Sequence, residues 1–199
     1  MNKLVIMDID GVLADFEGKL VNVLIGEFGE IATRNRDKFR LEDRYGEYPK
    51  VLGRALELVK DPNFYYGLDV YEGAADFVKK LVLNDYQIVY VSSRPVAAGS
   101  FTTGWLLKNF YGQAYAACGV ADKADFVSNM KDEIEFVVED NPEQIDNLKD
   151  GGLNVFCWSQ AWNEGVFPRL YVRSDGELML WMNEAEEAEP FWSLYKEKA

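Results

Sequence analysis

The amino-acid sequence predicts an α/β fold with a doubly wound, mostly parallel sheet. Two observations predict it: short, nearly continuous apolar runs alternate with amphipathic helical patterns, and polar residues follow the runs at their carboxyl ends. Continuous apolar runs are typical of parallel strands that are covered on both faces by helices. The β-α-β order indicates right-handed crossovers between neighbouring strands.

The expected elements follow one another along this pattern. The expected strands are residues 4–9, 87–91, 115–120, 136–138 and 154–158, and the expected core helices are residues 74–83, 101–111 and 142–148. In residues 169–182, Ser174-Asp175-Gly176 separates two apolar arms, which predicts a hairpin. The acidic tail after Asn183 contains Phe191 and Trp192, which we expect to dock on the core.

The interval between the first two expected strands is too long for a simple crossover. Residues 16–72 contain helical stretches at 19–28 and 51–59, separated by aromatic and charged segments. A small helical insertion accounts for this interval better than a disordered loop. We therefore predict a core formed by residues 1–15 and 73–199, with an inserted helical unit of residues 16–72.

Composition narrows the classes of function. The chain has 199 residues, of which 48% are hydrophobic, enough for a substantial core. No apolar run approaches the roughly 20 residues of a membrane helix, so we expect a cytoplasmic protein that does not bind a membrane. The net charge of −13 argues against binding to extended nucleic acid. A small anionic substrate is compatible with it if a metal ion reverses the field locally.

The complete absence of histidine removes several mechanisms. A Ser-His-Asp triad, a histidine phosphatase and a histidine-ligated zinc site are all excluded. The two cysteines, Cys118 and Cys157, form no disulfide framework. Chemistry must therefore come from carboxylates, hydroxyls, lysine, arginine or thiols.

Two acidic pairs stand at the ends of expected strands. Asp8 and Asp10 end the first, and residues two apart in an extended segment point to the same side. Glu139 and Asp140 end the fourth, although acids there also suit a helix N-terminus that begins at Pro142. Open α/β sheets bind ligands at this edge, which favours one shared site.

Hydroxyls and a lysine complete the pattern. Ser92 and Ser93 follow the second expected strand, where a helix N-cap is the ordinary explanation, and Lys123 lies between two aspartates, where a solvated charge is ordinary. The order of acid pair, hydroxyl, lysine and acid pair is less plausible as four coincidences than as one site.

This order resembles the four motifs of haloacid dehalogenase-type phosphatases, spread over residues 4–145. A closer resemblance is to the 5′(3′)-deoxyribonucleotidases. It is carried by Asp8 to Glu17, Leu41-Glu42-Asp43-Arg44, Asn63-Phe64-Tyr65-Tyr66 before Leu68, and Gly73-Ala74. The resemblance implies a haloacid dehalogenase-like core and assigns residues 16–72 to a helical cap over the active site.

The resemblance implies a magnesium-dependent phosphatase that hydrolyses nucleoside monophosphates. Asp8 is the expected nucleophile, Asp10 the acid and base, and Ser92 and Lys123 the remaining catalytic groups, with Glu139 orienting Lys123. Mg²⁺ is expected on Asp8, Asp140 and the backbone carbonyl of Asp10. The expected substrate-binding residues are Ser93, Arg94, Phe16, Tyr48, Phe64 and Tyr65, the four aromatic residues as stacking partners of the base.

The sequence departs from the family pattern at three positions. Ser92 stands where threonine is usual, Arg94 where proline is usual, and Glu139-Asp140 replaces a pair of aspartates. Other readings stay open: a phosphatase of a sugar phosphate or other small phosphomonoester, or a non-catalytic nucleotide-binding module. A homodimer is also left open.

Overall fold

The strands of the fold are joined in one mixed sheet. A computed structural model describes residues 3–112 and 114–195. Its strands are β1 (Lys3–Met7), β2 (Tyr86–Ser92), β3 (Tyr115–Cys118), β4 (Ile134–Glu139), β5 (Val155–Trp158), β6 (Arg169–Val172), β7 (Leu178–Trp181) and β8 (Glu189–Pro190). Within these residues they form one eight-stranded sheet in the order β3-β2-β1-β4-β5-β6-β7-β8. Neighbouring strands from β3 to β6 run parallel, and β7 and β8 add antiparallel pairs, so the predicted fold class is confirmed.

Helices cover both faces of the sheet. They are α1 (Phe16–Phe28), α2 (Leu41–Tyr45), α3 (Pro49–Lys60), α4 (Ala74–Leu83), α5 (Gly99–Asn109), α6 (Lys123–Val127), α7 (Pro142–Asp150) and α8 (Phe191–Tyr195). Short 3₁₀ helices lie at Gly29–Thr33, Pro62–Tyr65, Val96–Ala98, Ser128–Glu133 and Ala161–Asn163. No helix among the described residues has the length and apolar character needed to cross a lipid bilayer.

Alternation along β1 divides the core into two layers. Val5 and Met7 belong to the layer that contains buried residues of α4 and α5. Leu4 and Ile6 belong to the layer that contains buried residues of α6 and α7. Successive side chains of a strand point to opposite faces, so a strand covered on both sides must be apolar throughout.

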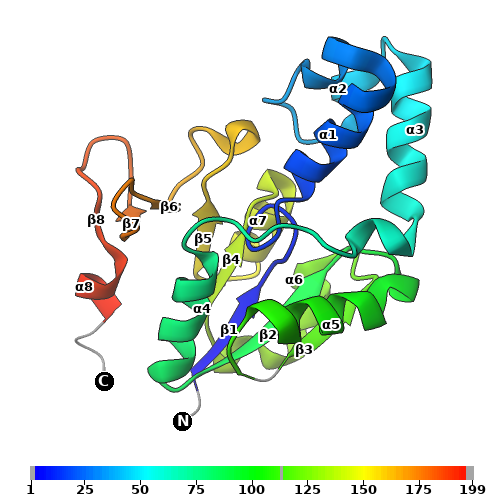
Figure 1. The fold of residues 1–199 in the computed structure, drawn as a ribbon. Helices are drawn as coiled ribbons and strands as arrows, with labels where there is room; N and C mark the ends of the chain where they lie inside the picture. The colour runs from blue at the N-terminus through cyan, green and yellow to red at the C-terminus, as the bar shows by residue number, and fades with distance from the viewer. Residues whose placement is uncertain (1–2, 113, 196–199) are drawn as a thin grey trace.

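The helices α1, α2 and α3 lie beyond the carboxyl end of β1, above the sheet in Figure 1. Asp15 caps α1, since its Oδ1 accepts a hydrogen bond from the Gly18 backbone N–H at 2.8 Å. A buried pair between Glu17 of α1 and Arg44 of α2 ties these helices together. A separate cap unit of residues 16–72 remains our prediction, and these helices fall inside it.

Two strands end earlier than the sequence pattern indicates. The first was expected to reach Ile9 but ends at Met7, because the backbone N–H groups of Leu13 and Ala14 both bind the carbonyl of Ile9 in a turn. The third was expected to reach Val120 but ends at Cys118, because Gly119 has a φ of 81°. Both turns release the chain at the edge where the acidic and hydroxyl residues gather.

The C-terminal prediction is confirmed. In the hairpin, β6 pairs with β7 from Arg169–Trp181 to Val172–Leu178. The tail then returns to the core, where the ring of Phe191 is fully buried and Trp192 packs against it at 5.0 Å between centroids.

Candidate active site

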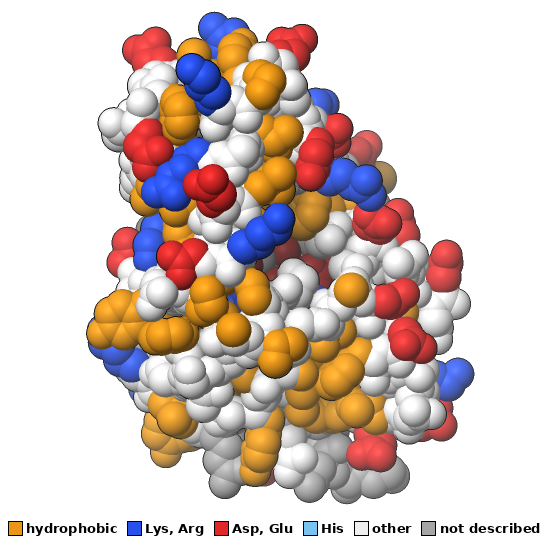
Figure 2. Space-filling model, turned by 90° about the vertical axis from the view of Figure 1, so that its right-hand side faces the viewer, with side chains coloured by type: hydrophobic (Ala, Val, Ile, Leu, Met, Phe, Trp, Pro, Cys, Tyr) orange, Lys and Arg blue, Asp and Glu red, His pale blue; other side chains and the backbone are white. Residues whose placement is uncertain are grey.

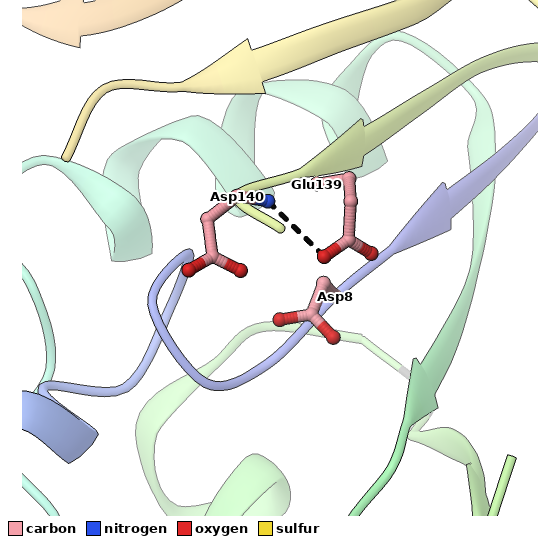
Figure 3. A group of neighbouring side chains, drawn as sticks. All are labelled: Asp8, Glu139 and Asp140. Atoms are coloured by element: carbon pink, nitrogen blue, oxygen red, sulfur yellow. Dashed lines mark hydrogen bonds between the residues drawn. The ribbon is translucent and has the colours of Figure 1, made fainter. Parts of the chain in front are cut away.

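Three carboxylates meet where the two central strands end. The register pairs Met7 of β1 with Val138 of β4, so the residues that follow emerge side by side. Ligand oxygens of Asp8, Glu139 and Asp140 lie within 4.8 Å of one another, and all three residues are buried. Figure 3 shows the carboxylates turned toward a common centre.

Lys123 is the cation of this group. Its Nζ, carried by the first residue of α6, donates hydrogen bonds to Asp8 and to Glu139. The other oxygen of Glu139 accepts from the backbone N–H groups of Asp140, at 3.2 Å, and Asn141, at 3.1 Å. Glu139 therefore contacts both the lysine and the loop that carries Asp140.

Burial and neighbouring charges shift the pKa values of this acidic group. Burial, and next Glu139, raises the pKa of Asp8 to about 8, although Lys123 opposes the rise. Burial and the charge of Asp8 likewise raise the pKa of Asp140. Burial disfavours the charged form of Lys123, but Asp8 and Glu139 outweigh it and raise the pKa of its ammonium. One lysine thus faces three buried carboxylates.

The donors of this group fit a hard divalent cation. Carboxylate oxygens are the ligands that Mg²⁺ prefers, and a cation would oppose both the burial and the mutual repulsion that raise the pKa values of Asp8 and Asp140. Gly11 leaves the necessary room: a Cβ at this position would lie 2.1 Å from Oδ2 of Asp140. The carbonyl of Asp10 belongs to the same loop.

The side chain of Asp10 has a different partner. Its two oxygens accept hydrogen bonds from Arg94, Oδ2 from Nε at 2.8 Å and Oδ1 from Nη2 at 2.6 Å. The carboxyl side chain of Asp10 is 21% exposed and lines the cleft described next, whereas the side chain of Arg94 is fully buried.

A cleft of about 540 Å³ opens above the acidic group. Figure 2 shows the hollow between the helices above and the sheet layer below, with acidic side chains at its floor. Residues of the sheet loops form one wall, among them Asp8, Asp10, Lys123 and Asp140. The opposite wall comes from residues 16–65 and includes Phe39 and Arg44.

The two serines are placed differently. Ser92 is buried, and its Oγ accepts a hydrogen bond from the Arg94 backbone N–H at 3.1 Å. Ser92 is not among the described residues that line the cleft. Ser93 is exposed and lines the cleft. The geometry thus offers Ser93 to a ligand more directly than Ser92, which holds the loop.

The four aromatic candidates also separate into two pairs. Phe16 and Tyr65 line the cleft and stack on each other, with centroids 6.1 Å apart and an angle of 23° between the ring planes. Phe64 packs edge-on against Phe16, and the hydroxyl of Tyr48 accepts from Arg34 at 2.7 Å. Neither Phe64 nor Tyr48 is among the described residues that line the cleft, so two of the four expected stacking partners lie outside it.

Comparison with known proteins places the chain in a family. Residues 2–173 match the family model described as 5′ nucleotidase, deoxy (pyrimidine), cytosolic type C protein. The chain belongs to this deoxyribonucleotidase family. The predicted resemblance is therefore confirmed.

Two individual relatives of this protein agree with the family assignment. It is 30% identical over 96 residues to the human mitochondrial 5′(3′)-deoxyribonucleotidase, a match of 46% of this chain and 42% of the human protein. It is 28% identical over 178 residues to a Staphylococcus epidermidis protein provisionally described as a 5′(3′)-deoxyribonucleotidase, a match of 82% and 88%. The chain thus spans less than half the length of the human relative.

A solved structure shows the same fold at low identity. A haloacid dehalogenase-like hydrolase from Streptococcus pneumoniae superposes with a TM-score of 0.53 and 13% identity, over 78% of this chain and 83% of the other. The haloacid dehalogenase-like core that the resemblance implied is therefore confirmed.

The sequence did not single out three residues that bind the loops of the acidic group, one of which, Trp162, also lines the cleft. The side chain of Trp162 donates from Nε1 to Oδ2 of Asp140 at 3.0 Å, and Asn163 donates from Nδ2 to the Asp140 carbonyl at 2.9 Å. Gln160 donates from Nε2 to the carbonyl of Gly11 at 2.6 Å. A signal was present, since these polar residues follow the fifth expected strand as the other site residues follow theirs.

Proposed function

We propose that this protein is a magnesium-dependent phosphomonoester hydrolase that acts on nucleoside monophosphates. The observation that carries the proposal is the buried group of Asp8, Glu139, Asp140 and Lys123 at the floor of a cleft. Membership of the deoxyribonucleotidase family supports the substrate class. Phe16 and Tyr65 supply aromatic surface in the same cleft for a base.

In the first step, a carboxylate oxygen of Asp8 attacks phosphorus while the ester P–O bond breaks on the opposite side. Asp10 gives its proton to the departing alkoxide, so the nucleoside leaves as a neutral alcohol. The product on the enzyme is an aspartyl-phosphate. Lys123, in contact with Asp8, stabilises negative charge on the transferring group.

In the second step, a water molecule attacks the same phosphorus. Asp10, now ionised, takes a proton from that water, and the bond between phosphorus and Asp8 breaks to release inorganic phosphate. Asp10 returns to its protonated form, so protons balance over the cycle. Ser93, exposed at the cleft wall, is placed to donate to a phosphate oxygen.

The negative charge of the carboxylates and of the phosphate substrate requires a cation. Two unit charges about 4 Å apart repel by ~4 kcal/mol at an effective dielectric near 20, and a phosphate dianion beside these carboxylates multiplies that repulsion. Asp8, Asp140 and the Asp10 carbonyl would hold Mg²⁺, which would supply charge neutralisation for the phosphate and its nucleophile.

Phosphate release from a panel of nucleoside 5′- and 3′-monophosphates and of sugar phosphates tests this proposal. We expect hydrolysis of nucleotides in preference to sugar phosphates, its loss in EDTA, and its recovery with MgCl₂. Asp8→Asn should abolish turnover at saturating magnesium, because an amide cannot attack phosphorus. Normal turnover in purified, folded Asp8→Asn protein would reject the nucleophile, and a preference for sugar phosphates would reject the substrate class.

A further inference from the structure

Arg94 is a buried arginine whose charged end contacts the carboxylate of Asp10. It follows β2 in the loop next to the site and forms an ion pair with Asp10. The contact uses two nitrogens on two oxygens, at 2.8 and 2.6 Å. Such a bidentate pair fixes the orientation of the carboxylate plane as well as its position.

The guanidinium is itself held from its other sides. Nη1 donates to Oγ1 of Thr102, on α5, at 3.1 Å. The rings of Tyr65 and Trp105 lie 4.8 and 5.7 Å from its central carbon. Trp105 is in turn fixed by a 2.7 Å hydrogen bond from Nε1 to the carbonyl of Leu68. Arg94 therefore connects the Asp10 side chain to α5 and, through Trp105, to the backbone at Leu68.

This arrangement distinguishes Arg94 from a simple phosphate ligand. Although Arg94 lines the cleft, all three nitrogens of its guanidinium are already bonded to Asp10 or Thr102, through three of its five N–H groups. We propose that Arg94 is a positioning residue that holds the Asp10 carboxyl where it exchanges protons with the leaving group and with water.

The inference rests on the proposed function, and it makes a prediction that a general packing role does not. An alkoxide leaving group, as in a nucleotide, needs the Asp10 proton as its P–O bond breaks. The p-nitrophenolate ion leaves without that proton because its charge is delocalised over the ring. Misplacing Asp10 should therefore slow aspartyl-phosphate formation from a nucleotide far more than from p-nitrophenyl phosphate.

The decisive experiment compares Arg94→Met with the unaltered protein on both substrates, using the nucleotide that the panel identifies. For the nucleotide, kcat/KM should fall about 100-fold, the scale of general acid catalysis. For p-nitrophenyl phosphate, kcat/KM should change little. Stopped-flow traces should show a burst of p-nitrophenolate, because breakdown of the aspartyl-phosphate still needs Asp10 as base. Inhibition by inorganic phosphate should be unchanged.

Three further variants test the interpretation. Asp10→Asn combined with Arg94→Met should be no slower than Asp10→Asn alone, since Arg94 acts through Asp10. Arg94→Lys keeps the charge but loses the planar fork, so it should show the same dependence on leaving group, and it replaces Arg94→Met if the latter does not fold. Thr102→Val, which removes a bond on the far side of Arg94, should show the same dependence in weaker form.

Different outcomes reject different statements. An equal fall of kcat/KM on both substrates, or additive losses in the double variant, would overturn the positioning role. Weaker inhibition by phosphate in Arg94→Met would make Arg94 a phosphate ligand instead. If the unaltered protein hydrolyses p-nitrophenyl phosphate but no nucleotide, the substrate class fails, and the comparison is repeated with whichever alkyl phosphate the protein accepts.

Discussion

Gly11 is the residue at which the first and fourth loops of the site come closest. Its φ of 87° lies in the left-handed region that glycine adopts without strain. Its missing Cβ also leaves the space that the Asp140 carboxylate occupies. The Asp-x-Asp-Gly sequence thus needs glycine for two separate physical reasons.

Replacing Gly11 by alanine should damage the site more than the fold. The new Cβ would displace Asp140, so we expect magnesium affinity to fall at least about tenfold, as when a group that orients a metal ligand is lost. Calorimetric titration with MgCl₂ measures this. Gly152→Ala is the matched control, because Gly152 has a φ of 85° but open space around it. It should lose about 1–2 kcal/mol of stability and keep its magnesium affinity.

At the residue scale, the sequence predicted which groups would gather but not all of their partners. Asp8, Lys123 and Asp140 were found because each follows a strand or a short loop at one edge of the sheet. The hydrogen bonds between Asp10 and Arg94 were not predicted. These residues come from two different loops, and their contact depends on how each side chain turns. Sequence spacing gives the side of the sheet on which a residue lies, not the direction in which its side chain turns.

The segment after β5, residues 159–163, supports the loops of the acidic group. Gln160, Trp162 and Asn163 together bind the loops that carry Gly11 and Asp140. The ring of Trp162 also faces the guanidinium of Arg44 at 5.3 Å and the ring of Phe39 at 6.3 Å. One short segment therefore contacts both the acidic group and the helices above it.

Trp162→Phe removes the indole N–H and keeps most of the ring contacts. Asp140 then loses an orienting hydrogen bond, so magnesium affinity should fall about tenfold. Equilibrium titration of the purified variant with MgCl₂ provides the measurement. Trp181→Phe is the control, since it removes an indole bond to the Glu186 carbonyl in the hairpin region. Equal magnesium affinities in the two variants would show that Trp162 does not orient Asp140.

Prediction at the element scale succeeded where a pattern was long enough. The helix at residues 74–83 is found with its expected ends, because four apolar positions repeat along ten residues. The five-residue helices α2 and α6 and the two-residue strand β8 were not predicted. Their few residues cannot establish a period, and their conformation depends on tertiary contacts.

At the scale of the whole molecule, the C-terminal tail completes one core layer. The buried ring of Phe191 lies 5.6 to 5.9 Å, centroid to centroid, from the rings of Phe77, Phe136 and Phe156. These partners belong to α4, β4 and β5, so the tail joins elements far apart in the sequence. Phe191 itself is not among the described residues that line the cleft.

Phe191→Ala should consequently destabilise the protein without altering its catalytic groups. Loss of a fully buried aromatic ring costs about 3–5 kcal/mol, which urea unfolding can measure. Phe126→Ala offers a matched control, because Phe126 is 38% exposed on α6 and should cost much less. At low temperature, where both variants stay folded, turnover should equal that of the unaltered protein. A stability change no larger than that of Phe126→Ala would show that the tail is not part of the core.

The strand order has a consequence for how the molecule is made. The strand β1 is synthesised before its partners β2 and β4, which begin only at Tyr86 and Ile134. Strands so distant along the chain pair slowly, because a long loop must close, at a cost in entropy, before their contacts stabilise the structure. During translation, β1, which leads directly to the nucleophile Asp8, cannot pair with β4 until residues 134–139 have been synthesised. The acidic group therefore assembles only once both strands are present, because Glu139 ends β4 and Asp140 follows it.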